Sequence, residues 1–155
     1  MLGQASNSML AQAEQGIQSK VPAQFQAALS KVVNAGLTIM YAPQNKEMRL
    51  QRMAQAGNPA RDAGAGAARM ISNLYAQSNK QMPLEVVVPA SMIFAFEYLD
   101  LLVKVKRLAI TPDLIAATTQ AVADAVLPMF GVSKDHMTQL VAYAKQQRAR
   151  QNKTR

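Results

Sequence analysis

The amino-acid sequence predicts an all-α protein of several short to medium helices joined by proline-marked turns. Three observations favour this fold class. Half of the 155 residues are apolar, and alanine dominates that half: the chain holds 27 Ala and 16 Gln against 4 Phe, 4 Tyr and no Trp. Alanine and glutamine favour helices, whereas sheet sandwiches need β-branched and aromatic runs. Apolar residues also recur at helical spacing between prolines.

The length corresponds to one domain. We expect a single helical domain over residues 1–155, with a polar, Gln-rich N-terminal lead at 1–20 and a basic C-terminal tail at 145–155. The lead has helical tendency but few apolar anchors. Pro22 suits the start of the next helix, which we expect to end at Pro43. Its apolar positions at helical spacing are Phe25, Leu29, Val32, Gly36 and Ile39.

A short helix through Met48 and Met53 comes next, and Gly57-Asn58-Pro59 is a strong break signal after it. Gly64 and Gly66 then lie in a segment rich in small residues. A phosphate-binding loop would need a preceding strand and a following Gly-Lys-Ser/Thr, and the sequence has neither. We therefore interpret the glycines as a close helix–helix approach or a flexible joint.

The most apolar helix is predicted from Pro89 to about Lys106. We expect Pro83 to start one helical turn and Pro89 to kink or restart the chain, so that Val86–Val88 lie on a separate short segment. A helix that is apolar nearly all round is buried, either in a core or against partner subunits.

Three polar residues of this helix, Glu97, Asp100 and Lys104, form one narrow stripe. Two neighbouring carboxylates can act as an acid–base pair. A surface ion pair between Asp100 and Lys104, four residues apart, is the simpler interpretation.

Thr111-Pro112-Asp113 marks the start of the next helix, with a capping hydroxyl, a proline at the first position and an acid in the first turn. We expect that helix to end at residues 128–131. Ser133 caps a last predicted helix, over residues 134–144. His136 lies in its first turn beside Asp135, and one Asp–His neighbour pair is a weak signal for a metal site, so we interpret it as a surface histidine.

Composition also limits the function. The chain has no cysteine, which excludes disulfides, thiolate metal sites and a cysteine nucleophile, and its one histidine leaves little for acid–base catalysis near neutral pH. We predict that the protein is not an enzyme and has no catalytic residue, no metal site and no cofactor. The longest stretch without a charged side chain is 14 residues, Val32–Asn45, and a membrane span needs about 20.

The net charge of +8 is uneven. The final eleven residues hold five cations and no acid, so the body carries only +3. Such a tail attracts polyanions, namely nucleic acid, anionic lipid or an acidic partner. A solvated helix end explains it equally well, because cations suit a helix C-terminus. The candidate polyanion contacts are Lys145, Arg148, Arg150, Lys153 and Arg155.

Residues 81–133 resemble small late-gene proteins of tailed bacteriophages. The pattern opens with Pro83, Val86, Pro89 and Ala90, continues through an apolar helix, a short basic joint and an Ala-rich helix, and closes with Phe130-Gly131-Val132. With the Ala/Gln-rich lead and the basic tail, the chain resembles the internal virion or ejection proteins of short-tailed phages. Its size is similar to that of the smallest ejection protein of podophages that carry a virion RNA polymerase.

The resemblance implies a protein stored in the virion and released into the host envelope at infection. It would join a homo-oligomer, with a ring expected, together with other ejection or portal–tail proteins. The assembly would be part of a channel at the host outer membrane, with genomic DNA in the lumen held by non-specific charge. Glu97 and Asp100 would face the lumen or a partner. The candidate membrane or subunit interface residues are Val86, Val87, Ile93, Phe94, Phe96, Leu99, Leu102 and Val103.

Two alternatives from other classes stay open. One is a head–tail connector or decoration protein that never leaves the virion. The other is a small helical nucleic-acid-binding protein that uses the basic tail and a second cluster of cations. That second cluster consists of Lys46, Arg49, Arg52, Arg61 and Arg69.

Overall fold

The computed structural model describes residues 5–55 and 57–131, and within that part it is all-helical with no strand. The predicted fold class is confirmed there. The predicted helix at 134–144 and the basic tail lie outside the described residues. The α-helices are α1 (Ser8–Lys20), α2 (Gln26–Met40), α3 (Lys46–Ala54), α4 (Pro59–Gln77), α5 (Leu84–Lys106) and α6 (Pro112–Val126). Short 3-10 turns cover Ala23–Phe25, Pro43–Asn45 and Leu127–Phe130.

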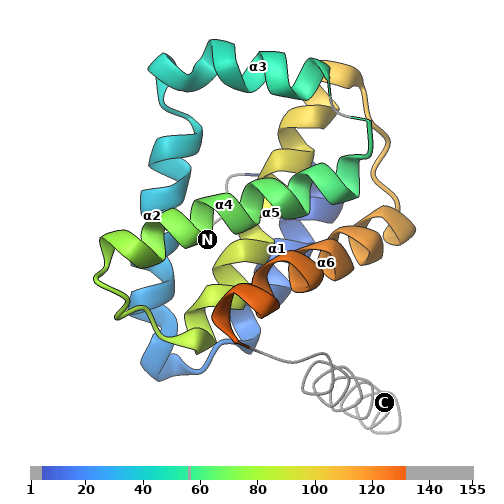
Figure 1. Ribbon diagram of the computed structural model, residues 1–155. Coiled ribbons are helices and arrows are strands. Elements are labelled where there is room, and N and C mark those ends of the chain that lie inside the picture. Colours follow the sequence, from blue (N-terminus) through green and yellow to red (C-terminus); the bar gives the residue numbers. More distant parts are fainter. Residues whose placement is uncertain (1–4, 56, 132–155) are drawn as a thin grey trace, which may run out of the picture.

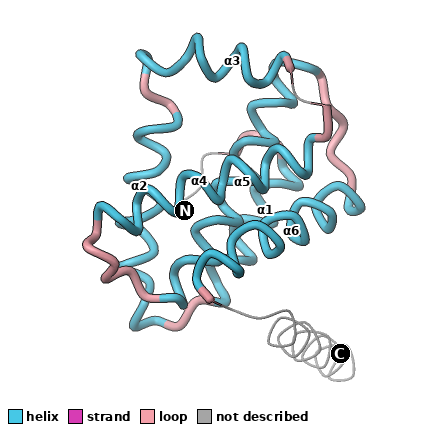
Figure 2. The backbone as a smooth tube through the Cα atoms, in the orientation of Figure 1, coloured by secondary structure: helices cyan, strands magenta, loops and turns pink. Residues whose placement is uncertain are grey.

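Helix α5 forms the centre of the bundle (Figure 1). Helices α4 and α6 lie side by side and both pack on α5, while α1 and α2 also pack against α5. The short helix α3 bridges the outer ends of α2 and α4 (Figure 2). The largest fully buried side chains include four from the middle of α5: Ile93, Phe94, Leu99 and Leu102. The hydrophobic core is therefore arranged around one helix.

The starts of the helices follow local capping chemistry. Thr111 Oγ1 accepts a hydrogen bond from the Leu114 amide at 3.1 Å, and Pro112 takes the first helical position, as predicted. Asn58 Oδ1 accepts from the Arg61 amide at 3.1 Å, so the break at residues 57–59 also begins α4. Both signals satisfy backbone amides that have no partner within the first turn.

The prediction for Pro89 is wrong in one respect. Val86–Val88 belong to the same helix as Phe96, because α5 already begins at Leu84 and continues through Pro89. The amides of Val86 and Val87 both donate to the Pro83 carbonyl, at 3.0 and 3.2 Å, so a helical turn exists before Pro89 is reached. Pro89 is the sixth residue of α5, so it removes one hydrogen bond within the helix and its ring crowds the Glu85 carbonyl, yet the helix continues past it.

Gly64 confirms the prediction of a close helix–helix approach, and Gly66 does not share in it. A Cβ atom added at Gly64 would lie 2.8 Å from the carbonyl carbon of Ala121 on α6, whereas one at Gly66 would meet nothing within 4 Å. Helices α4 and α6 therefore approach so closely at Gly64 that no side chain fits between them.

The N-terminal lead contributes more to the core than its composition suggests. Residues 8–20 form α1, and its Leu10 side chain is fully buried. Asn7 caps the helix by accepting hydrogen bonds from the amides of Met9 and Leu10, at 3.0 and 3.2 Å. In α2 the predicted positions Leu29 and Gly36 are buried, but Val33 and Leu37 complete the buried face while Ile39 is exposed.

Candidate functional site

The structure covers the candidate interface residues with the chain's own helices. All but Val103 are buried, and Val103 is half-buried: the seven are Val86, Val87, Ile93, Phe94, Phe96, Leu99 and Leu102. Their burial in one chain removes the need for a partner or a membrane to cover them. Contact with lipid or with a neighbouring subunit would require the helices around α5 to open.

The five cations of the C-terminal tail lie outside the described residues. In the second basic cluster, Arg49 is turned inward: its guanidinium donates to the Met40 carbonyl and lies 5.9 Å from the centre of the Tyr41 ring. The side chains of Lys46, Arg52, Arg61 and Arg69 are exposed on α3 and α4. The cluster therefore offers four exposed cations on two helices rather than five on one surface.

Three carboxyl groups lie buried between α1 and α5. Glu97 is 0%, Asp100 1% and Glu14 3% exposed. The expected pair of Asp100 and Lys104 is present, with Lys104 Nζ 3.3 Å from Asp100 Oδ2, but only the lysine reaches the surface. The pairing is confirmed, but its interpretation as a surface ion pair is wrong for Asp100, because α1 covers that side of α5.

Asp100 holds the beginning of α1. Its carboxylate accepts hydrogen bonds from the backbone amides of Ser6, at 3.1 Å, and Asn7, at 3.0 Å. Burial alone would raise the pKa of Asp100, but these amides and the Lys104 ammonium outweigh it, so the pKa lies below its ordinary value. Asp100 is thus a satisfied, ionised group that ties α1 to α5.

Glu14, unlike Asp100, is buried without hydrogen-bond donors. Neither of its carboxyl oxygens has a hydrogen-bond donor among the described residues. Burial, the negative charge of Glu97 and hydrogen bonding between the two carboxyls raise the pKa of Glu14 to about 9. Two carboxylates are both acceptors, so they bond to each other only when one carries a proton. At neutral pH the structure therefore favours a protonated Glu14.

Tyr41 closes the cluster from α2. Its hydroxyl donates to Glu97 Oε2 at 2.7 Å. Burial and this hydrogen bond to Glu97 raise the pKa of the Tyr41 hydroxyl, which keeps it a donor at all ordinary pH values. Glu97 thus has a hydrogen-bond partner that does not depend on the state of Glu14.

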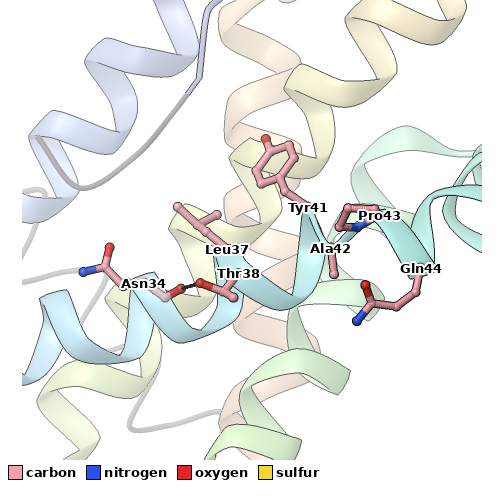
Figure 3. Close-up of a pocket in the computed structure, with 7 residues that line it drawn as sticks. All are labelled: Asn34, Leu37, Thr38, Tyr41, Ala42, Pro43 and Gln44. Atoms are coloured by element: carbon pink, nitrogen blue, oxygen red, sulfur yellow. Dashed lines mark hydrogen bonds between the residues drawn. The ribbon is translucent and has the colours of Figure 1, made fainter.

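Tyr41 also lines an open hollow of about 550 Å³ at the end of α2 (Figure 3). The other lining residues are Asn34, Leu37, Thr38, Ala42, Pro43 and Gln44. None is charged, and the Thr38 hydroxyl is already engaged with the Asn34 carbonyl at 2.7 Å. The hollow therefore has no charged side chain that would select a charged ligand.

The arrangement can hold two helices together and can gain or lose a proton. The described residues contain no group of three or more His, Cys, Asp or Glu side chains placed to hold a metal ion. Comparisons with known protein families, with characterised proteins and with solved structures found no match for this chain.

The sequence analysis missed Glu14 and Tyr41. A signal for Glu14 was present, because it lies four residues after Leu10 and three before Ile17, on the apolar side of the predicted helix. An acidic residue on an apolar face is unusual and points to a buried polar contact.

Proposed function

We propose that this chain is a phage virion protein that is released into the host envelope and becomes part of an oligomeric channel for genome delivery at the outer membrane. Its role in this proposal is structural rather than catalytic. Support comes from the resemblance of residues 81–133 and from one feature of the structure, helix α5.

Helix α5 is the observation that carries the proposal. It is the one helix among the described residues that is long and apolar enough to cross a membrane, although about two thirds of its most apolar window is buried inside the chain. The sequence analysis found no uncharged stretch of that length because Glu97 and Asp100 interrupt it. Both carboxyls are buried in the folded chain, where Asp100 accepts hydrogen bonds from the Ser6 and Asn7 amides and Glu97 accepts one from the Tyr41 hydroxyl.

The fold sets a condition on this function. The apolar side chains of α5 can reach lipid or a neighbouring subunit only after the covering helices separate from it. The proposal therefore has two states: a closed bundle in the virion, and an opened chain in which α5 joins a ring of subunits. Glu97 and Asp100 would then face the lumen or a partner, and the basic tail would contact DNA or anionic headgroups.

Fractionation of infected cells tests the proposal. Virions carrying isotopically labelled protein are allowed to infect, and the chain is quantified in the outer membrane, the inner membrane and the emptied particles. We expect it in the outer-membrane fraction, while the capsid protein, as the control, stays with the particles. Recovery of the chain only in emptied particles would overturn the proposal.

A connector or decoration protein that stays in the virion is the second candidate. The observation that favours it is the same burial: a helix whose most apolar window is about two thirds buried inside the chain needs no membrane, and core helices of soluble proteins share its length and apolar character. Retention of the chain in emptied particles is the outcome that this candidate predicts.

A further inference from the structure

We propose that α1 is a proton-dependent latch on α5, which stays closed while one proton is shared between Glu14 and Glu97 and loosens when that proton is lost. The latch is a property of the isolated chain and does not depend on the proposed function. It would decide under which conditions the covered side of α5 becomes accessible.

The charged groups around Glu14 make the contact between α1 and α5 depend on the proton of Glu14. From α5 it faces Glu97 and, further away, Asp100, and both act on it as negative charges. Among the described groups that act on Glu14, only the backbone amide of Ala5 favours its ionised form, and that amide forms no hydrogen bond of ordinary geometry with either carboxyl oxygen. The Lys104 ammonium is bound to Asp100, and from α2 the Tyr41 hydroxyl is bound to Glu97. Neither group is directed to Glu14.

The proton changes what the pair of carboxyls can do. With it, the Glu14 hydroxyl donates to a Glu97 oxygen, and the contact between α1 and α5 is a hydrogen bond. Without it, two carboxylates meet at a site from which water is excluded, and they repel each other. The ionised Glu14 regains hydration only by leaving the interface, so α1 is expected to move away from α5.

The two ends of the contact respond differently. Asp100 binds the Ser6 and Asn7 amides as a carboxylate, so that tie persists at high pH. Loosening should therefore begin at the second turn of α1, around Glu14, while residues 6 and 7 stay attached. Such a partial release separates α1 from α5 without unfolding the chain.

A tryptophan reporter tests the latch, because the natural chain has none. Ile17→Trp places the reporter on α1, where Ile17 packs partly buried against the core. Tyr75→Trp is the matched reporter on α4, beside Phe130 and away from the cluster. The wavelength of maximum emission is measured from pH 5 to pH 10, with far-UV circular dichroism to follow total helix content.

We expect the Ile17→Trp emission to move to longer wavelength with a midpoint near pH 9, while the Tyr75→Trp emission and the helix content stay constant. Adding Glu14→Gln, which keeps the shape of the side chain and cannot ionise, should abolish the shift. Glu47→Gln removes an exposed carboxyl on α3 and should leave the emission shift unchanged.

A shift that survives Glu14→Gln would overturn the latch, and so would a simultaneous change of both tryptophan emissions and the helix content. If Glu14→Gln does not fold, a constant emission in the Ile17→Trp chain up to pH 10 would overturn it as well.

Discussion

Helix α5 is held on two sides by different means. The α4–α6 pair packs on it mainly through small and apolar core residues such as Ala63, Ala67 and Val122, and Gly64 on α4 meets the backbone of Ala121 on α6. Helix α1 packs on it around three buried carboxyls, Glu14, Glu97 and Asp100. Close packing of apolar groups does not depend on pH, whereas a buried carboxyl is stable only in one protonation state. The first side is therefore a permanent contact and the second a conditional one.

This difference bears on how a covered helix could be exposed. Opening the α4–α6 side would forfeit dispersion contacts and apolar burial all at once. Opening the α1 side has a chemical trigger, because no cation of the described residues offsets the charge of Glu14. We therefore expect any regulated exposure of α5 to begin with α1.

The largest expected loss of stability comes from the middle of α5, and it tests whether this helix forms the core against both α1 and the α4–α6 pair. Phe96→Ala should lower the free energy of unfolding by about 3–5 kcal/mol, because Phe96 is 2% exposed and its removal leaves a cavity. Leu84→Ala on the same helix is the control, and at 52% exposed it should change stability by less than about 0.5 kcal/mol. Urea unfolding measures both. Equal effects would mean that α5 is not organised around a buried face.

The permanent side is tested by a pair of glycines on α4. Gly64→Ala should destabilise the chain by about 1–3 kcal/mol, because the new Cβ meets the backbone of Ala121, which cannot rotate away. Gly66→Ala meets nothing and should stabilise by up to about 1 kcal/mol through helix propensity. Urea midpoints that move in the same direction for both variants would contradict the close approach.

The conditional side is tested by the pH dependence of stability. Glu14 binds its proton more tightly in the folded chain than in the unfolded one, since its pKa rises from 4.5 to about 9. Its contribution is therefore fully present below pH 4.5 and is lost as the pH rises toward 9, with a slope of at most about 1.4 kcal/mol per pH unit. Glu14→Gln should flatten this part of the curve and raise stability most at high pH.

Unfolding by urea at pH values from 5 to 9 measures that slope. Glu47→Gln is again the control, because its carboxyl is exposed. A wild-type curve that rises with pH over this range would contradict the assignment of Glu14 as protonated.

The smallest expected loss of stability comes from the helix caps, one on α1 and one on α6. Asn7→Ala on α1 and Thr111→Ala on α6 each remove side-chain acceptors of first-turn amides, and each should cost about 1 kcal/mol at neutral pH. Thermal unfolding should show a cost that is the same at pH 7 and pH 9 for Thr111→Ala and for Asn7→Ala, because residues 6 and 7 stay attached to Asp100 when the contact around Glu14 loosens. A cost for Asn7→Ala that changes between the two pH values would mean that the release begins at the start of α1.

Much of the fold was predictable because its signals are local. The Thr111-Pro112 start depends on residues next to one another and predicted α6, and Gly57-Asn58-Pro59 predicted the break that precedes α4. The apolar character of α5 predicted burial, yet it did not distinguish a core from a subunit interface. Pro89 misled because a proline is usually a boundary, and the turn that begins at Leu84 was not expected to continue through it.

The candidate site was not predictable in the same way. Asp100 pairs with Lys104 four residues away, which spacing predicts, but its other partners Ser6 and Asn7 are more than 90 residues distant in sequence. Contacts of that kind follow from how the helices are arranged in space, and one sequence does not contain that information.

Hydrogen exchange resolved by helix tests the central claim, that the α1 cover depends on a proton and the α4–α6 cover does not. The protection of α1 and α6 amides in the wild-type chain is compared between pH 7 and pH 8.5, after correction for the intrinsic exchange rate. We predict that the opening constant of α1 rises by about tenfold per pH unit, as the loss of one proton requires, while that of α6 stays constant. Equal protection of both helices at both pH values would contradict the account.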